Sequence, residues 1–451
     1  FKLKLKDDIR RLYDVHKETV NQAHPFSQFS VGNIDTLADN KQSNVQQDIV
    51  NFFNDHYRAN AMTVAIEGPQ PINMLESLAE KYFKGVESGG EKLKKIDIPL
   101  YEPRHLMQEI KVNPVKNDKQ LIISFGFPCL EKYYRNKPES LLAYLIGHEG
   151  PGSILSALKA KHWALNLTAG SGISGSNFKD FNISISLTEE GEQATDEIIA
   201  LIFSYIELLK QDVLPHHYYF EKQSLAETAF QYMEKSKPLD SVSHLVVNMH
   251  HYPSEDYLYG DYVMEGLCDD TITKLLTFLT VENCRIIRIG QDFNCDKTSH
   301  WYQVPYSTNA IVQSRIQQWK KAPLDKALFL PPPNEFIVNT PSIWPHSHET
   351  AKPAQLESQN GLCVWFKQDT TFKVPKGYLY IGMDSPVSVA SVENIAMTRL
   401  FVDIYSETVI EKHYDAELAG IHYHLYSHQG GMTLQLSGLS EKQPLLLEKL
   451  L

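Results

Sequence analysis

The chain has 451 residues, of which 42% are hydrophobic, and its net charge is −12 at neutral pH. This length accommodates roughly three domains of ordinary size. Acidic and basic residues are interspersed, which argues against a nucleic acid as the main partner. The sequence contains no apolar run of about 18 residues, so we expect no membrane insertion.

The two ends of the chain and its cysteines carry further information. The chain begins without Met inside an apolar helical pattern and stops inside another one, LLLEKLL. Natural termini are usually polar and loosely held, so we expect a fragment of a longer protein. Five cysteines are scattered without a C-x-x-C pair, a pattern typical of reduced, mostly buried thiols.

Hydrophobic periodicity predicts helices and strands along most of the chain. Apolar residues three and four positions apart indicate helices, and alternation of apolar and polar residues indicates half-buried strands. Leu5, Ile9 and Leu12 share the apolar face of the first helix, and Thr188 has the position of a helix cap. The predicted helices lie at about 1–19, 45–53, 72–83, 188–209, 216–233, 237–249, 270–279 and 391–414, with a last helix from Ser440, and the predicted strands lie at 61–68, 121–127, 181–187, 284–290, 362–369, 378–383, 419–427 and 432–438.

The stretch 144–170 predicts a helix end, a glycine and proline corner, a second helix and a strand. Its His148–Glu149 pair invites comparison with zinc peptidases, in which two histidines lie one helical turn apart around a glutamate. The position of the second histidine is occupied by Gly152, and the inverted motif H-x-x-E-H occurs nowhere. The residues alone therefore favour a polar corner that caps a helix.

Gly170, Gly172 and Gly175 spell G-x-G-x-x-G, the fingerprint of dinucleotide-binding proteins. That motif binds phosphate at the N-terminus of the helix that follows it. Here the glycines lead into residues 181–187, which alternate with period two and predict a strand. The context argues against dinucleotide binding.

His422, His424 and His428 are expected on one face of a strand, because side chains alternate along it. Such a group allows a metal site. The sequence indicates no fourth ligand or nearby carboxylate, so we favour polar positions that face solvent.

Two parts of the chain, around 250 residues apart, share the same order of elements. Each has a strand, a helical segment, an Ala-Gly strand, an alternating strand and a turn into an apolar helix. The Ala-Gly pairs are Ala169–Gly170 and Ala419–Gly420. This duplication predicts an α+β fold in which helices pack on one face of a mostly antiparallel sheet.

Several stretches resemble the pitrilysin/insulinase family of zinc metallopeptidases, in family order and over nearly the whole chain: HPFSQFSVGNIDTL, YLIGHEGPGSILSALKAKHWA, ISLTEEG and PPPNEFI. The resemblance implies homologous, duplicated domains in two halves that enclose a chamber, where peptides and small unfolded proteins are cleaved. It assigns residues 1–95 to the C-terminal half of the first, catalytic domain. Residues 96–330 would form an inactive second domain, and residues 331–451 the N-terminal part of a third.

The resemblance also implies where the zinc chemistry lies. The family's site is H-x-x-E-H with a distant glutamate, and its zinc polarises the scissile carbonyl and acidifies a bound water. Matching the family places this motif before Phe1 and the assisting residues of a fourth domain after Leu451. We therefore expect no catalytic residue and no zinc in this chain, and no peptide hydrolysis by the chain alone.

One function of the family does map onto the chain. In one branch, an exosite anchors the N-terminal end of a substrate, and the matching residues here are Gly147, His148, Glu149, Gly150, Leu167, Thr168, Ala169 and Gly170. An exposed strand edge offers unpaired N–H and C=O groups to an added peptide strand. Glu149 could attract a free amine. The chain departs from the family stretch at Thr168 and Ala169, which leaves the edge intact but bears on specificity.

An alternative is a non-catalytic member of the family that acts as a peptide-binding or structural subunit. Such members are shorter two-domain chains, whereas the segment that follows Pro331–Pro333 favours the large single-chain branch. Peptide substrates are the expected partners, and self-association into a homo-oligomer stays open. The absence of disulfide patterning favours the cytoplasm, with a periplasmic location as the other option.

Overall fold

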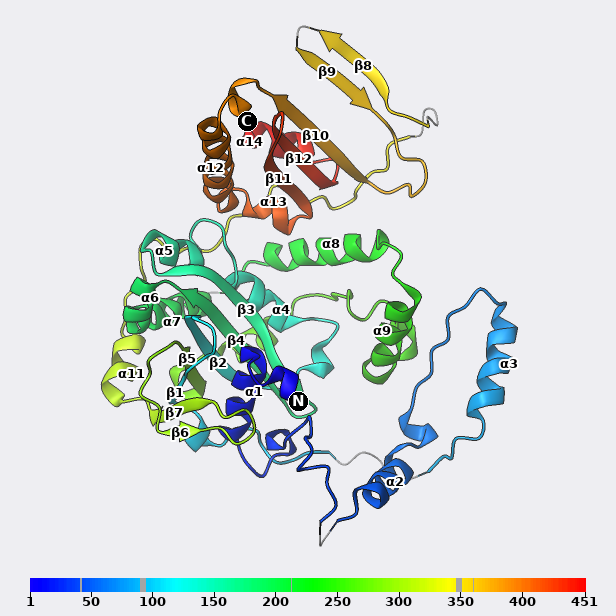
Figure 1. Ribbon diagram of the computed structural model, residues 1–451, viewed down its shortest axis with the longest axis vertical. Coiled ribbons are helices and arrows are strands. Elements are labelled where there is room, and N and C mark those ends of the chain that lie inside the picture. Colours follow the sequence, from blue (N-terminus) through cyan, green and yellow to red (C-terminus); the bar gives the residue numbers. More distant parts are fainter. Residues whose placement is uncertain (41–42, 90–94, 212, 346–350, 360) are drawn as a thin grey trace. The chain divides into compact units, whose positions relative to one another are not determined.

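The computed structural model describes residues 1–40, 43–89, 95–211, 213–345, 351–359 and 361–451 (Figure 1). These residues form two units. The first unit comprises residues 1–216 and 234–331, and the second comprises residues 217–233 and 332–451. Each unit has a sheet of its own.

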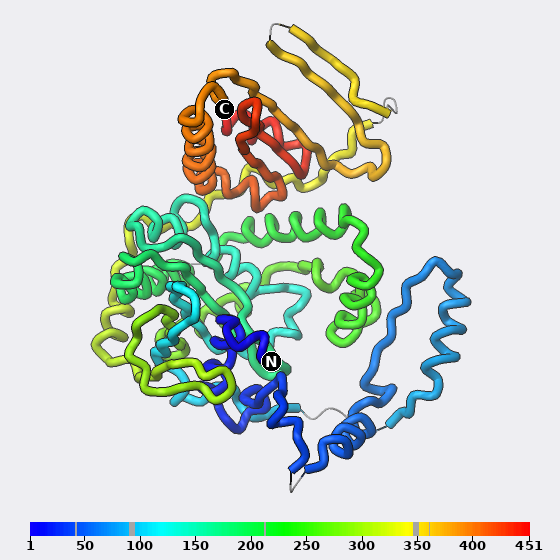
Figure 2. Tube along the Cα trace, in the orientation of Figure 1, coloured from blue at the N-terminus to red at the C-terminus, as the bar shows by residue number. Residues whose placement is uncertain are grey.

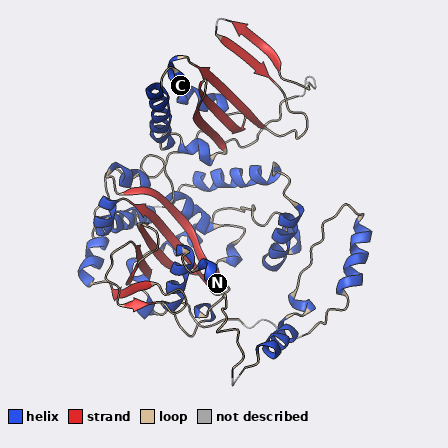
Figure 3. Cartoon of the chain, in the orientation of Figure 1, coloured by secondary structure: helices blue, strands red, loops and turns tan. Residues whose placement is uncertain are grey.

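A seven-stranded sheet forms the centre of the first unit (Figure 3). Strands β1 and β5 pair in parallel, and all other neighbouring pairs are antiparallel, which confirms the mostly antiparallel sheet. The strand order is β3-β4-β2-β5-β1-β7-β6, so β3 and β6 are the two edges. The strands are β1 Gln108–Val112, β2 Gln120–Pro128, β3 Ala164–Gly175, β4 Phe178–Leu187, β5 Cys284–Ile289, β6 Lys297–Thr298 and β7 Pro305–Ala310.

Helices of the first unit pack on this sheet, α7 on the face that carries Leu121 and α1 on the opposite face. Leu121, Ile123 and Phe125 alternate along β2 and are fully buried. The ring of Phe203 on α7 packs edge-on against Phe125, with centroids 6.0 Å apart, and stacks on Trp319 of α11. The helices of the unit are α1 Asp8–Glu18, α2 Val45–His56, α3 Ile72–Phe83, α4 Pro138–Ile146, α5 Ile154–Ala160, α6 Glu189–Gln193, α7 Thr195–Gln211, α9 Pro238–His251, α10 Asp269–Leu276 and α11 Gln313–Lys320.

Helix α1 packs through Val15 against buried apolar residues of β1, β5 and β7. It begins at Asp8, where Asp7 caps it, and not at Phe1 as the periodicity predicts. The side chain of Ile9 is 81% exposed, so the predicted apolar face is wrong at that position. The face that packs is centred on Val15, one turn beyond the predicted stripe.

The predicted strand at 61–68 is absent, and Figure 3 draws this stretch as loop. Its alternating residues Met62, Val64 and Ile66 are each about two-fifths exposed. A strand is stable only when a neighbouring strand accepts its hydrogen bonds, and no described strand lies beside this stretch. The alternation is therefore real, but its hydrogen-bonding partner is missing among the described residues.

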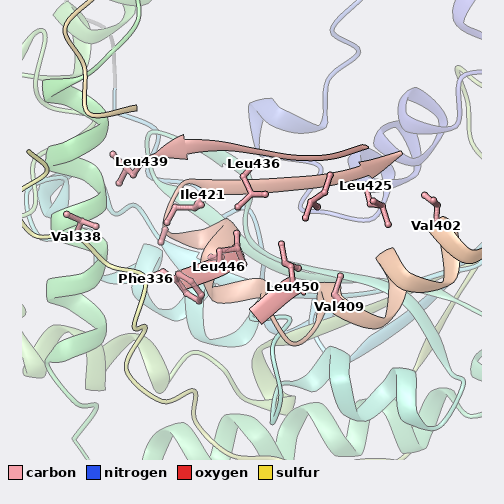
Figure 4. Packing of buried hydrophobic residues seen from close by; sticks show 13 residues of the cluster. Phe336, Val338, Val402, Val409, Ile421, Leu425, Leu436, Leu439, Leu446 and Leu450 are labelled. Carbon is pink, nitrogen blue, oxygen red and sulfur yellow. The ribbon is translucent and has the colours of Figure 1, made fainter. Parts of the chain in front are cut away.

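The second unit contains a three-stranded sheet of order β10-β12-β11 and a separate β8-β9 pair. Its core lies between the sheet and the helices (Figure 4), and Leu436 and Leu446 are fully buried there. The last helix begins at Gln443 and not at Ser440, whose hydroxyl donates to the carbonyl of Pro375 instead. The elements are α8 His217–Gln231, β8 Ala354–Gln359, β9 Leu362–Phe366, β10 Lys376–Asp384, α12 Val392–Ile410, α13 Tyr414–Leu418, β11 Ile421–His428, β12 Gly431–Leu439 and α14 Gln443–Leu450.

The duplication is confirmed at the level of whole elements. In the first unit, β2, α4, α5, β3 and β4 follow one another, and β4 lies between β3 and β2. In the second, β10, α12, α13, β11 and β12 follow one another, and β12 lies between β11 and β10. The predicted equivalence of the Ala-Gly pairs is wrong, because Ala169–Gly170 lie inside β3 whereas Ala419–Gly420 end α13.

The cysteines are free thiols, as expected, but most of them are not buried. All five thiols are free, but only Cys284 is buried, whereas Cys268 and Cys363 are exposed. Cys363 is exposed although it lies in the apolar stretch LCVWF, because β9 belongs to a separate two-stranded sheet whose residues are mostly exposed.

Candidate substrate-anchoring site

The corner that follows α4 is built by backbone hydrogen bonds. Gly147 ends the helix, and its N–H donates to the carbonyl of Ala143 at 2.9 Å. The ring of His148 is only 3% exposed, and its Nδ1 accepts a hydrogen bond from the N–H of Gly150 at 3.1 Å. This confirms the polar corner at a helix end.

Helix α5 starts directly after this corner. The hydroxyl of Ser153 accepts a hydrogen bond from the N–H of Ser156, which caps the helix. The trace in Figure 2 then runs from α5 into β3. The helix cap therefore fixes the path along which the corner and the strand are connected.

Strand β3 is an edge of the sheet and pairs only with β4 among the described strands (Figure 1). Leu167 and Ala169 lie opposite Ile185 and Ile183, and Leu167 points into the core with 1% exposure. Thr168 points to the other face and is exposed. The outer backbone edge of β3 has no neighbouring strand in the part of the chain that the structure describes.

The corner and the strand lie against each other. A Cβ placed on Gly147 would be 3.4 Å from both the backbone nitrogen and the Cβ of Ala169, and one placed on Gly170 would be 3.6 Å from the Cβ of Ala143. The structure thus brings the two predicted segments, 147–150 and 167–170, together in space. Their role in binding stays a prediction.

Glu149 supplies the negative charge of this corner. Burial raises the pKa of its carboxyl group, and the neighbouring Lys159 and His148 act in the opposite direction. The side chain is half-buried, so a charged partner would be shielded from water on one side. A cation next to Glu149 would therefore interact more strongly than at a fully exposed carboxylate.

A cavity of about 880 Å³ lies beside the far half of β3. Its walls include Glu139, whose carboxylate accepts from the Ser171 hydroxyl at 2.7 Å and pairs with Lys179. Sequence reasoning missed this cavity, because its residues come from four separate segments and form no motif. Several of its walls are aromatic or small: Tyr133, Tyr134, Ser140, Ala143, Ser174, Phe178 and Tyr252.

Comparison with known proteins places the chain among peptidases. The profile described as "Peptidase M16 inactive domain" matches residues 44–225, and "Middle or third domain of peptidase_M16" matches residues 230–451. Insulin-degrading enzyme of Homo sapiens is 34% identical to this chain over an alignment of 451 positions. The alignment covers 99% of this chain and 44% of the relative. The chain belongs to the pitrilysin/insulinase family, peptidase family M16.

Two further members of the family are similar to nearly the whole chain. The insulin-degrading enzyme-like 1, peroxisomal, of Arabidopsis thaliana is 30% identical over 98% of this chain and 46% of the relative. The crystal structure of pitrilysin matches with a TM-score of 0.87 and 26% identity, covering 99% of this chain and 48% of the other. The chain thus spans less than half the length of these M16 relatives, and it shares their duplicated α+β fold.

The histidines of β11 were the other candidates for a metal centre in this M16 chain. His422 lies within hydrogen-bonding distance of Glu417, a carboxylate that sequence reasoning did not place there. His428 bonds to the hydroxyl of Thr433 at 3.1 Å, and all three histidines of β11 are exposed. Among the described residues, no group of three or more His, Cys, Asp or Glu side chains is arranged to hold a metal ion. The residues described here therefore do not fit the zinc site of the family.

The helices described in this structure include none with the length and apolarity needed to cross a bilayer.

Proposed function

We propose that the whole protein is a zinc-dependent metalloendopeptidase that encloses and hydrolyses peptides and small unfolded proteins. This chain would supply part of the chamber wall and a strand edge that anchors the substrate. The observation that most supports the anchoring role is the outer edge of β3, which pairs with no described strand and lies directly beside the corner at Gly147–Gly150.

Strand addition fits the chemistry of this edge. An extended peptide that pairs with β3 would satisfy backbone N–H and C=O groups that otherwise face solvent. Affinity would come from main-chain hydrogen bonds, so it would tolerate many substrate sequences. The neighbouring cavity, with its aromatic walls, could take one side chain of the added strand.

The corner at Glu149 would favour a peptide with a free N-terminus. An ammonium group next to a half-buried carboxylate forms an ion pair with it, whereas an acetylated N-terminus carries no charge and offers only a neutral amide N–H. The corner would thereby hold the first residue of the peptide, while the residues that follow extend along β3. Backbone atoms of Gly147 and Gly150 can approach the peptide closely, because neither residue has a side chain.

The zinc site would lie on a part of the protein outside this chain. The sequence lacks H-x-x-E-H, and the M16 relatives are about twice as long. In this arrangement residues 1–95 complete a catalytic first domain, residues 96–330 form an inactive second domain, and residues 331–451 begin a third. The chain alone would then bind peptides without cleaving them.

The proposal is tested by isothermal titration of the 451-residue chain with an unstructured peptide, free and N-acetylated, together with a zinc assay. Binding that weakens on acetylation, without stoichiometric zinc and without cleavage, would support it. Tight stoichiometric zinc or cleavage would contradict the location of the metal site. A non-catalytic subunit would bind in the same way, so hydrolysis by the whole protein separates that alternative.

A further inference from the structure

A second cavity, of about 310 Å³, lies in the first unit where the end of α1 meets β5, β6 and β7. It shares no residue with the proposed anchoring site. Its walls are Glu18, Thr19, Val20, Gln22, Arg104, His105, Gln108, Ile110, Arg285, Lys297, Tyr306 and Thr308, and we call it the basic pocket.

Arg285 is the most unusual wall of the basic pocket, because it is a charged side chain that is only 1% exposed. Its Nη2 donates to the carbonyl of Thr19 at 3.1 Å, so the guanidinium caps the C-terminal end of α1. The same Nη2 donates to the hydroxyl of Thr19, and Nη1 donates to the hydroxyl of Tyr101, over whose ring the guanidinium also lies. The Nε of Arg285 has no acceptor among the described residues.

A buried cation costs free energy unless an opposite charge compensates it. No described carboxylate lies within ion-pair distance of Arg285. Asp180 is linked to it through the Tyr101 hydroxyl, which donates to Asp180 at 2.8 Å. The helix end and the aromatic ring compensate part of the charge, but one N–H donor remains unused.

The other charges of the basic pocket have the same sign. Arg104 and Lys297 add two cations, and burial together with Arg104 and Arg285 lowers the pKa of His105. The one acidic wall is Glu18, and its carboxylate already accepts hydrogen bonds from the Tyr306 hydroxyl and the N–H of His300. The walls therefore include three cations and one carboxylate that already accepts two hydrogen bonds. Arg104 pairs with Glu102 at 2.8 Å and Lys297 donates to the hydroxyl of Thr308, whereas Arg285 has no carboxylate of its own.

We propose that the basic pocket binds a small oxyanion, a phosphate or carboxylate group, between Arg104, Arg285 and Lys297. Arginine presents N–H donors in a planar fork that fits such oxygens, and a lysine adds a point charge. Thr308 and Gln108 supply further polar groups at the wall. The volume exceeds that of one phosphate, so the oxyanion can be part of a larger organic molecule.

The experiment is isothermal titration of the 451-residue chain with inorganic phosphate and, separately, with succinate. Chloride keeps the ionic strength constant in both series, so that general salt effects cancel. We expect saturable binding of one equivalent in at least one series. Phosphate binding tighter than succinate assigns a phosphate group, and the reverse order assigns a carboxylate.

Variants locate the binding. The double variant Arg104→Gln with Lys297→Gln should weaken binding about tenfold or more, whereas Lys297→Arg should change it little. Lys274→Gln removes an exposed lysine on α10 and serves as the matched control, with unchanged affinity expected. Absence of saturable binding in both series would overturn the proposal. Equal affinity in the double variant and the Lys274→Gln control would overturn it as well.

Discussion

Gly147 lies directly against Ala169. A Cβ at position 147 would be 3.4 Å from the backbone nitrogen of Ala169 and 2.8 Å from the carbonyl oxygen of Ala143. The second distance is shorter than folded proteins accept for a Cβ. A side chain at position 147 would therefore clash with the last turn of α4, whereas it would make an ordinary van der Waals contact with Ala169.

Replacing Gly147 should disturb the corner where α4 ends. We expect Gly147→Ala to lower the free energy of unfolding by about 1–3 kcal/mol, because the added methyl group overlaps the carbonyl oxygen of Ala143 and the corner must shift. The same variant should weaken peptide binding. Chemical denaturation and isothermal titration measure the two effects. Gly85→Ala is the matched control, since a Cβ at Gly85 meets nothing within 4 Å, and equal effects of both variants would argue against the proposed contact.

The carboxylate of Glu149 should select peptides with a free N-terminus. We expect Glu149→Gln to weaken binding of an unmodified peptide about tenfold, since the ammonium group of the peptide loses its oppositely charged partner. Binding of the N-acetylated peptide should not change. Glu189→Gln, at a carboxylate whose side chain is 90% exposed, is the control. A similar loss for both peptides would show that Glu149 acts through folding and not through the amine.

Asp180 should make stability depend on pH. Burial raises the pKa of its carboxyl group to about 7 from 3.8, although Tyr101 and Arg285 oppose the shift. The folded state therefore binds more protons than the unfolded state between these values. The stabilising contribution is complete below pH 3.8 and is lost as the pH rises to about 7, by up to about 1.4 kcal/mol for each pH unit.

The variant Asp180→Asn isolates this contribution, because asparagine keeps the acceptor for Tyr101 but does not ionise. His16 acts in the opposite direction, since burial and Arg285 hold its pKa well below 6.5 and its contribution rises with pH. His16 is present in both proteins, so the difference between them reports Asp180. Denaturation from pH 4 to 8 should show the variant gaining stability relative to the parent as the pH rises. A constant difference would contradict the prediction.

The core of the second unit should depend on the strand that lies at the centre of its sheet. Leu436 on β12 is fully buried, so Leu436→Ala should lower the free energy of unfolding by about 2–5 kcal/mol. Leu356 on β8 is 63% exposed, and Leu356→Ala should have an effect below about 0.5 kcal/mol. Thermal unfolding followed by circular dichroism compares the two. Equal shifts would contradict a core that is centred on β12.

Periodicity predicted elements with a clear apolar pattern, whether or not that pattern is buried. The alternation at residues 181–187 became β4, which is buried on one face, and the apolar spacing at 72–83 became α3 with the same bounds, although no residue of α3 is buried. The strands β1 and β7 were missed, because QEIKV and PYSTNA are short and partly polar. The stretch 61–68 failed in the opposite way, since its pattern is clear but strand pairing depends on a neighbour distant in sequence.

In the candidate site too, local features could be predicted from the sequence, whereas features that join distant segments could not. The corner at His148 could be predicted from Gly147 and Gly150, because glycines mark turns from the local sequence alone. That β3 is an edge strand depends on the order β3-β4-β2, which no residue of β3 reveals. The contact of Gly147 with Ala169 joins two segments through packing, and a local sequence pattern does not predict it either.

Hydrogen exchange of β3 tests the central claim most directly. Strand addition protects the outward amides of the edge strand and leaves the opposite edge of the same sheet, β6 at Lys297–Thr298, unchanged. Exchange should be followed by mass spectrometry with and without a saturating unstructured peptide. We predict slower exchange within residues 164–175 and an unchanged rate at β6. Protection elsewhere in the first unit, with β3 unaffected, would contradict the assignment of this edge as the anchoring strand.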